Sequence, residues 1–261
     1  MPALNLLVDQ IIQGLYTFLW PMLRISALLL TAPIFSLDAI TLRIRILFAV
    51  ALTLVVYPLV QWPVIDPVTP RGLYEIFNQI LIGALMGLML QIVTAALVVA
   101  GQAIAAALGL SMANMIDPNV GNVPTISQFL IVLSTLMFVG MGGHTVAIAI
   151  ILESFRSLPI GQSLVGETAL PNLIAWSGLM FSGALLLALP TMASLLFVNV
   201  GLGIVTRAAP SLNIFAIGFA AMIPAGLLIM MMSMTHMANR IEWLWLQAFL
   251  RVRGVLGLGG G

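Results

Sequence analysis

Histidines and carboxylates are the side chains of this sequence that could act as general acids, general bases or metal ligands. His144 stands in MGGHTVAIAIILESF, nine residues before Glu153, and the other histidine, His236, is far from both. The sequence has no cysteine, no HExxH motif and no second histidine near His144, so we predict no metal site. GxSxG, Walker A and dinucleotide-binding motifs are absent as well. We therefore predict no catalytic residue and no cofactor, and we interpret His144 as a hydrogen-bonded structural residue.

Arg24 lies inside a long apolar run, in WPMLRISALLL. A charge at such a position is costly unless it meets a partner, water or the interior of a helix bundle. Because Arg24 is also near the end of the run, its side chain has a second option, which is to extend to the membrane surface. Both alternatives are open at the level of sequence.

The composition excludes a soluble globular protein. Of the 261 residues, 62% are hydrophobic and 7% are charged, whereas soluble domains have roughly 45–50% and about 25%. We predict a polytopic inner-membrane protein. The net charge of +1 indicates no attraction to nucleic acid. The N-terminus lacks the basic region of a cleaved signal peptide, so the first apolar run is expected to be retained.

Six apolar runs could span a membrane, and none shows the alternation of a strand, so the predicted class is all-α. These runs are Ile11–Phe35, Ile46–Trp62, Ile76–Gly109, Phe129–Leu152, Leu173–Val205 and Ile214–Met237. Between the first two, SLDAITLRIR (Ser36–Arg45) is predicted to be a short charged turn.

The third run is too long for one span, so it is either two spans or one helix that projects beyond the bilayer. Splitting it places six arginines on one side of the membrane and two on the other, whereas leaving it whole gives five against three. The split therefore fits the positive-inside rule better, with a cytoplasmic C-terminus and with Gly109–Pro124 on the outer side.

Small residues and prolines mark the predicted helices. Gly83 and Gly87 form a GxxxG pair, which allows close helix packing either within the subunit or against a neighbouring one. Gly101, Ala105 and Gly109 repeat the spacing. Prolines 190 and 224 stand inside the last two runs and are expected to kink or break them.

Two segments combine flexibility with methionine. GLSMANMIDPNVGNVP (Gly109–Pro124) interrupts the apolar sequence with glycines, prolines and one acid. MIPAGLLIMMMSMTHM (Met222–Met237) is methionine-dense, which suits either lipid-facing filler or a deformable lining around something that moves.

Four motifs in order resemble one family, the R subunit of the bacterial flagellar type III export gate, FliR, with its injectisome counterpart SctT (SpaR). The motifs are AGQAIAAALGLSMANMIDP (Ala100–Pro118), GGH (Gly142–His144), ESFRSLPIG (Glu153–Gly161) and TRAAPSLNIFAIGF (Thr206–Phe219). They cover nearly the whole chain in length and order, and they favour the flagellar branch.

The resemblance implies a non-enzymatic, structural and gating component of the flagellar basal body in the bacterial inner membrane. Such proteins complete a ring with FliP and FliQ, with FlhB and FlhA nearby, and unfolded flagellar subunits pass through the lumen. The complex sits partly on the periplasmic side, which would explain the overlong third run as a projecting helix. The chain would be one domain (1–261), with a P-like part (about 1–185) followed by a Q-like helical hairpin and tail (about 186–261).

The resemblance also assigns roles to residues. The loop after the long helix would project into the lumen and close it, and its glycines, its methionines and its near lack of charge fit that role. The plug residues would be Gly109, Leu110, Ser111, Met112, Ala113, Asn114, Met115, Ile116, Asp117, Pro118, Asn119 and Gly121. Structural or motif residues would be Gly101, Gly142, Gly143, His144, Glu153, Pro159, Arg207, Pro210 and Asn213, with Gly83 and Gly87 in packing. We expect Arg207 and His144 to fix connectors through hydrogen bonds.

Two other functions compete with this interpretation. A small-solute secondary transporter would need inverted repeats and polar ligands at the membrane midplane, and the sequence shows no clear repeat and few such groups. An intramembrane hydrolase would need a nucleophile beside a base, and no serine motif accompanies His144.

Overall fold

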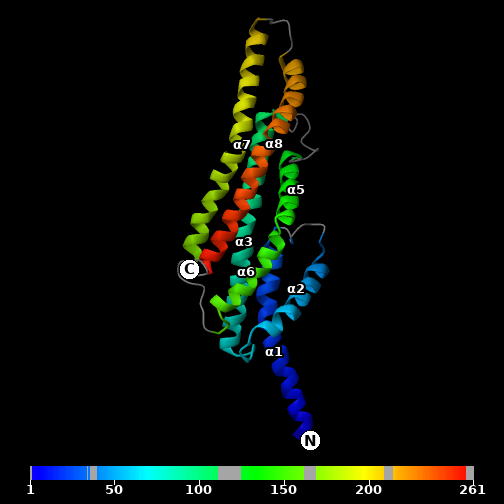
Figure 1. Ribbon diagram of the computed structural model, residues 1–261, viewed down its shortest axis with the longest axis vertical. Coiled ribbons are helices and arrows are strands. Elements are labelled where there is room, and N and C mark those ends of the chain that lie inside the picture. The colour runs from blue at the N-terminus through cyan, green and yellow to red at the C-terminus, as the bar shows by residue number, and fades with distance from the viewer. Residues whose placement is uncertain are drawn as a thin grey trace. The chain divides into compact units, whose positions relative to one another are not determined.

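The computed structural model describes residues 2–33, 35, 40–110, 125–161, 169–208 and 214–256, and these residues contain helices and no strand. The all-α prediction is confirmed (Figure 1). The helices are α1 (Pro2–Thr31), α2 (Leu42–Val56), the 3-10 helix η1 (Tyr57–Leu59), α3 (Pro70–Ala107), α5 (Thr125–Gly140), α6 (Gly143–Ser157), α7 (Ala169–Ala208) and α8 (Ile214–Val255). In the described part of the chain, five helices are long and apolar enough to cross a membrane, or six if α5 and α6 together form one span.

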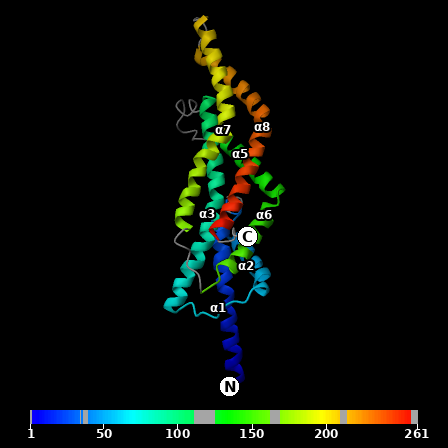
Figure 2. The ribbon, with the colours of Figure 1, turned by 60° about the vertical axis from the view of Figure 1, so that its left-hand side comes forward.

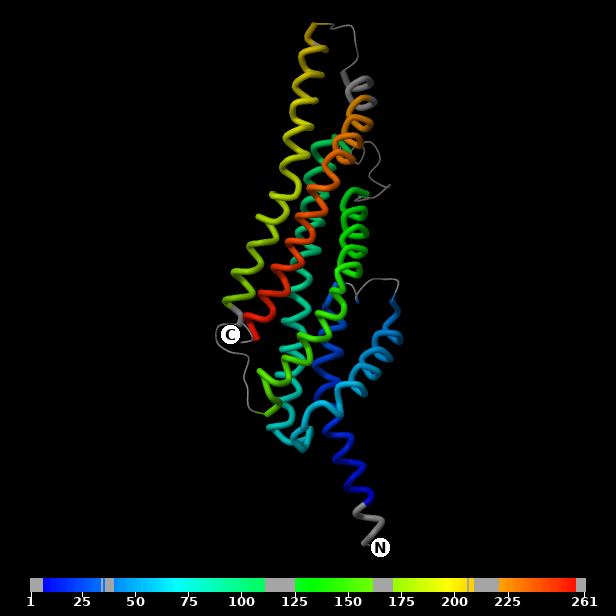
Figure 3. The backbone as a smooth tube through the Cα atoms, in the orientation of Figure 1, coloured from blue at the N-terminus to red at the C-terminus, as the bar shows by residue number. Residues whose placement is uncertain are grey.

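The third apolar run is one helix, which corrects the prediction that it splits into two spans. α3 is continuous over 38 residues, about 57 Å at ~1.5 Å per residue, and Figure 3 shows no interruption along it. The six-against-two arginine count assumed that the run splits. Without the split, this count no longer supports a cytoplasmic C-terminus or a 109–124 loop on the outer side of the membrane. The alternative of a projecting helix accounts for the length, because ~30 Å of hydrocarbon needs only about 20 residues.

Two further expectations about boundaries change. α2 begins at Leu42, so Arg43 and Arg45 belong to its first turn and not to the connector. α7 and α8 continue through Pro190 and Pro224, so neither proline breaks its helix, while the alternative that each kinks its helix stays a prediction. The break lies instead between α5 and α6, where Gly142 has φ 70°, a left-handed conformation that suits glycine.

The chain folds into two compact units, and each is made from separate segments. Unit 1 contains Met1–Ile92, Gly142–Ser177 and Gln247–Gly261, and unit 2 contains Val93–Met141 and Gly178–Leu246. These boundaries differ from the predicted P-like and Q-like parts, whose division stays a prediction.

In unit 1, α1 packs along the first half of α3, as both views show (Figures 1 and 2). The glycines of the GxxxG pair face α1. A Cβ atom at Gly83 would lie 2.3 Å from the backbone oxygen of Arg24, and one at Gly87 would lie 1.9 Å from Thr31 Oγ1. In this structure the close approach therefore joins two helices of the same subunit.

The start of α3 is fixed by its own sequence. Pro70 is the first helical residue, a position where its missing N–H leaves no bond unmade. The hydroxyl of Thr69 accepts a hydrogen bond from the Gly72 N–H at 3.1 Å, which is the bond of an N-cap residue. Gly72 packs against Asp66 and Pro67 of the preceding connector, so the connector is held to the helix.

In unit 2, the second half of α3 packs against α5, α7 and α8. Trp245 of α8 donates from Nε1 to Ser134 Oγ of α5 at 2.9 Å, and its ring lies 4.7 Å from that of Phe138. A Cβ atom at Gly183 of α7 would lie 2.8 Å from a methyl carbon of Leu244. The core of this unit is therefore aromatic and aliphatic, with the Trp245–Ser134 bond satisfying its indole.

α7 and α8 keep much of their apolar surface exposed. In the best spanning window of α3, 61% of the residues are buried, against 22% in the corresponding windows of α7 and α8. Phe197 is 78% exposed and Met232 is 86% exposed. Such faces require lipid or other apolar protein around them.

We predict that Gly83→Ala destabilises the protein, because the added methyl would overlap the backbone of α1, which cannot move aside cheaply. The expected cost is about 1–3 kcal/mol, measured as a lower Tm of the purified protein in detergent. Gly14→Ala in α1 is the matched control, since nothing lies within 4 Å of that position. It should leave the Tm equal or slightly higher, because alanine favours helix. Equal Tm values for the two variants would contradict the packing.

Candidate functional site: the base of the 109–124 loop and a buried arginine cluster

Most of the predicted plug lies outside the described residues. Gly109 and Leu110 are described, and the others are Ser111, Met112, Ala113, Asn114, Met115, Ile116, Asp117, Pro118, Asn119 and Gly121. What the structure provides is the base of this loop, formed by the end of α3 and the start of α5 in unit 2.

α3 ends in a glycine-capped turn. The N–H of Leu108 donates to the Ile104 oxygen at 3.0 Å, and the N–H of Gly109 donates to the Ala106 oxygen at 3.0 Å. Gly109 has φ +77°, the left-handed conformation in which helices commonly terminate. The chain therefore leaves the helix axis at Gly109.

Leu108 anchors this turn between α7 and α8. It is almost completely buried, and it occupies the space that a side chain at Gly226 would need. A Cβ atom at Gly226 would lie 1.7 Å from Leu108 Cδ2 and 3.4 Å from Leu195 Cδ2. The absence of a side chain at Gly226 is thus what lets the end of α3 approach α8.

The return end of the loop is held against the same helix. Ser127, in the first turn of α5, donates its hydroxyl to the Val98 oxygen at 3.0 Å. A Cβ atom at Gly101 would lie 2.4 Å from Ser127 Cα, so α3 and α5 touch backbone to backbone there. The 109–124 segment therefore leaves from the end of α3 and returns to the start of α5, which packs against α3 in unit 2.

Unit 1 contains a buried arginine, which decides between the two sequence alternatives for Arg24. Its side chain has no exposed surface, so it lies in the interior and does not extend to the membrane surface. Its Nε donates to Gln79 Oε1 at 2.7 Å, and the guanidinium carbon lies 4.4 Å from the centre of the Phe155 ring. A charge on the face of an aromatic ring is a favourable arrangement when both are desolvated.

The two terminal nitrogens of Arg24 bind the end of α6. Nη1 donates to the Ser154 backbone oxygen at 2.8 Å and to Ser154 Oγ at 3.1 Å, and Nη2 donates to the Leu158 oxygen at 2.8 Å. The last carbonyls of a helix have no intrahelical donors and carry partial negative charge. Arg24 therefore acts as the C-terminal cap of α6, supplied by another helix.

Glu75 balances the charge of Arg24. Its side chain is buried, and it accepts a hydrogen bond from Gln79 Nε2, so Gln79 bridges the carboxylate and the guanidinium. Removing one member of a buried pair of opposite charges lowers stability by about 3–5 kcal/mol, because the other charge is left buried without compensation. The cluster thus ties α1, α3 and α6 together.

Two more arginines reach the ESFRSLPIG motif, which begins in α6. Arg71 donates to the Gly161 oxygen at 3.4 Å, and Arg253 of α8 pairs with Glu153 at 3.4 Å. Both side chains of the second pair are about 40% exposed, so it contributes at most about 1 kcal/mol. Arg24, Arg71 and Arg253 come from three helices, and all bind the 153–161 segment.

The other predicted motif residues are dispersed. His144 and Arg207 are exposed, Gly143 is buried, and Gly142 takes the left-handed turn before α6. Pro159 lies in the connector after α6, while Pro210 and Asn213 fall outside the described residues. The hydrogen-bonding roles of His144 and Arg207 stay predictions. Among the described residues, no group of three histidine, aspartate or glutamate side chains could hold a metal ion.

Sequence reasoning missed Glu75, Gln79 and Ser154 as members of the cluster. A signal existed for the first two, because glutamate and glutamine four residues apart share one face of an apolar helix. Ser154 offered no such signal, since its main contribution is a backbone carbonyl 130 residues from Arg24.

The fold and these buried contacts define a class, the polytopic helical membrane proteins whose internal charges are satisfied within the bundle. Residues 15–248 match the family described as bacterial export proteins, family 1, and the chain belongs to this family, in its FliR group. A flagellar biosynthetic protein FliR from Pectobacterium carotovorum is 37% identical over 212 residues, 81% of each chain.

Two further relatives carry the same name. The FliR of Escherichia coli K12 is 33% identical over 242 residues, 92% of this chain and 93% of its own length. The FliR of Bacillus subtilis is 28% identical over 257 residues, 97% of this chain and 99% of its own. The resemblance inferred from the four motifs is confirmed.

We predict that Arg24→Met lowers stability by about 3–5 kcal/mol, because Glu75 would remain as a buried carboxylate without its cation. The double variant Arg24→Met/Glu75→Met should recover much of this loss, because the charge and its partner leave together. Tm and the folded fraction in gel filtration measure both effects. Arg253→Gln, which removes an exposed arginine, is the control and should cost less than about 1 kcal/mol. A double variant no more stable than Arg24→Met would show that the two charges are not coupled.

Proposed function

We propose that this protein is a structural and gating component of the flagellar type III protein export channel, in which it completes a ring with FliP and FliQ. Membership of the export family and similarity to FliR proteins support the coarser statement, that it is a membrane protein of the flagellar export apparatus. The ring, the neighbours FlhB and FlhA, and the passage of unfolded flagellar subunits are the finer parts of the proposal.

The observation that carries the gating role is the construction of the loop base. Leu108 occupies the space that a side chain at Gly226 would need, and Ser127 is hydrogen-bonded to α3. Both ends of the 109–124 segment therefore have defined positions in unit 2. Between them lies a nearly uncharged sequence with Met112, Met115 and Ile116. A segment with fixed ends and apolar side chains can close against other apolar groups with little desolvation cost.

The exposed apolar faces of α7 and α8 support assembly with partners. In the lipid bilayer such faces would be satisfied by acyl chains, and in a ring they would be covered by neighbouring helices. The length of α3, about 57 Å, exceeds the hydrocarbon thickness and fits an inner-membrane complex partly raised to the periplasmic side.

The alternative of a small-solute transporter lacks comparable support. The buried polar cluster of unit 1 is already satisfied by Gln79, Ser154 and Leu158 around Arg24, so it offers no free ligands to a solute. We likewise propose that the protein is not an enzyme, since the relatives are named for flagellar biosynthesis.

Deletion of residues 111–122 tests the plug. In cells that make the complete export complex, we expect the deletion to raise leakage of ions or small molecules, measured with a membrane-impermeant dye. A second variant replaces the segment by glycine and serine at the same length, and it should leak as well, because it removes the apolar contacts while keeping the chain length. Unchanged leakage in both variants, with the complex shown to assemble, would refute the plug but not the ring.

Co-expression with FliP and FliQ tests the ring. Purification through a tag on this chain alone should yield one large particle with both partners, because the exposed faces of α7 and α8 would be buried in it. A matched variant, Met232→Asp, places a charge on the most exposed of these side chains and should reduce the yield of the particle. A chain that purifies without either partner and binds a small solute would favour the transporter.

A further inference from the structure

Two glutamines at the base of the 109–124 loop carry amide groups that the described fold does not use. Gln102 lies on α3, seven residues before Gly109, and Gln128 lies in the first turn of α5. Both side chains are exposed, and among the described residues neither amide has a hydrogen-bond partner. By contrast, three hydroxyl groups of α5 are hydrogen-bonded, those of Ser127, Ser134 and Thr135. The two amides therefore keep their donors and acceptors available to a molecule outside the unit.

The two amides lie on the same side of the α3–α5 pair. The helices touch where a Cβ atom at Gly101 would lie 2.4 Å from Ser127 Cα, and each glutamine is the next residue along its helix. α5 runs back along α3 in the opposite direction (Figure 1). One step along a helix turns the side chain by about 100°, and in antiparallel helices this turn carries both side chains from the contact to the same side. Gln102 and Gln128 are therefore neighbours on one exposed surface, which we call the amide face.

The surroundings of the amide face are uncharged. Neither α3 nor α5 carries a charged side chain within unit 2, and Val132, one turn after Gln128, is 50% exposed. Acyl chains would leave the two amides without hydrogen bonds, which is costly, so this face suits water or a polar partner and not lipid. Because no charge stands beside the amides, the face does not select a partner by its charge.

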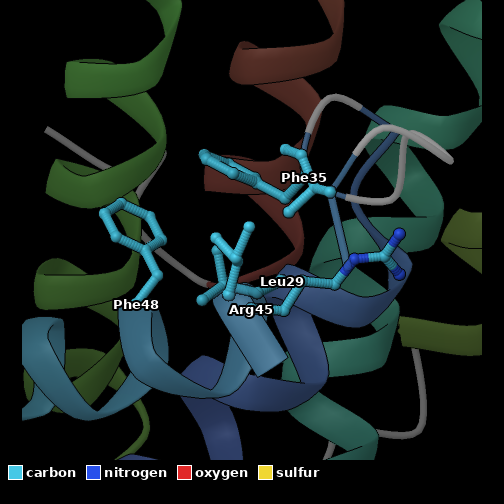
Figure 4. Close-up of a pocket in the computed structure, with 6 residues that line it drawn as sticks. Leu29, Phe35, Arg45 and Phe48 are labelled. Carbon is cyan, nitrogen blue, oxygen red and sulfur yellow. The ribbon is translucent and has the colours of Figure 1, made fainter. Parts of the chain in front are cut away.

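The apolar pocket of unit 1 has the opposite character (Figure 4). It lies between the end of α1 and the first turns of α2, and its lining presents no polar surface. The stacked rings of Phe35 and Phe48, with centroids 5.7 Å apart, form part of its wall. Since a polypeptide main chain needs hydrogen-bond donors and acceptors, the amide face can bind one and this pocket cannot.

From these observations we propose that Gln102 and Gln128 bind the main chain of the unfolded polypeptide that passes through the export channel. This inference rests on the proposed function, and it adds which side of the α3–α5 pair meets the exported chain. A carboxamide both donates and accepts, as a peptide group does, so it can pair with the backbone of any sequence. An unfolded chain has free N–H and C=O groups to offer, whereas a helix of a neighbouring subunit uses its own internally. The amide face therefore fits an unfolded substrate better than a folded partner.

Photochemical cross-linking tests the contact. A benzophenone-bearing phenylalanine replaces Gln102 or Gln128 in cells that make the complete export complex. The probe is a flagellar filament subunit fused to a tightly folded domain, which stalls in the channel. Both positions should cross-link to the stalled subunit. Phe197 of α7, which is 78% exposed in the same unit, is the control position and should not. Cross-links from Gln102 and Gln128 only to lipid or to a neighbouring subunit, or equal cross-linking to the probe from Phe197, would overturn the proposal.

The role of the amide groups is tested by two matched double variants. Gln102→Leu/Gln128→Leu removes both amides, and Gln102→Asn/Gln128→Asn keeps them on shorter side chains. Because both positions are exposed, each variant should yield as much assembled particle with FliP and FliQ as wild type. Secretion of the filament subunit should fall about 5–10-fold in the leucine variant, as expected from the loss of two hydrogen bonds, and less than about 2-fold in the asparagine variant. Wild-type secretion by the leucine variant, or an equal loss in both variants, contradicts the inference.

Deletion of the whole chain separates this inference from the proposed function. Secretion that continues unchanged without the chain would refute the proposed function itself. Secretion that requires the chain, but with no cross-link from either glutamine to the stalled subunit, would overturn only the amide face.

Discussion

Desolvation of the Arg24 guanidinium is the constraint on which the rest of unit 1 depends. A charge with no exposed surface must be met by acceptors from the protein, and here they come from two distant segments, Gln79 of α3 and the carbonyls that end α6. Because the acceptors sit on α3 and at the end of α6, the cluster holds α1, α3 and α6 together. Gly83 packs against the backbone of Arg24 in the same region, and its lack of a side chain allows α3 to lie close to α1 there.

In unit 2, close packing at glycines holds the helices at both ends of the 109–124 segment. This unit fixes both ends of the 109–124 segment, while α7 and α8 keep large apolar faces exposed. Glycines 101 and 226 remove side chains where α3 meets α5 and α8, and Leu108 and Ser127 occupy the space gained. Contacts of this kind involve little polar surface, so they are compatible with lipid on the outside of the unit. In this chain, small-residue packing therefore occurs in both units, and the buried arginine cluster belongs to unit 1.

Hydropathy and motif order made the helical class, the approximate spans and the family predictable, because apolar run length and family motifs are local properties of sequence. The unbroken course of α3 was not predictable from arginine counting, since that rule assumes that each span only crosses the bilayer. For the cluster around Arg24, the sequence predicted only that a buried arginine needs a partner, and it did not show which residues would be that partner. The acceptors of Arg24 are 55, 130 and 134 residues away, and two of them are backbone carbonyls, which carry no side-chain signature. The plug residues from Ser111 to Gly121 lie outside the described structure, so their role still rests on the family resemblance.

α3, α7 and α8 each pass from one unit into the other without a break in the helix, at Ile92, Ser177 and Leu246. A helix cannot be severed at such a point without exposing several backbone groups that have no water to bind. Because three helices are shared between the units, neither unit corresponds to one continuous stretch of sequence. A single fragment cut from the chain would therefore contain part of both units or only part of one.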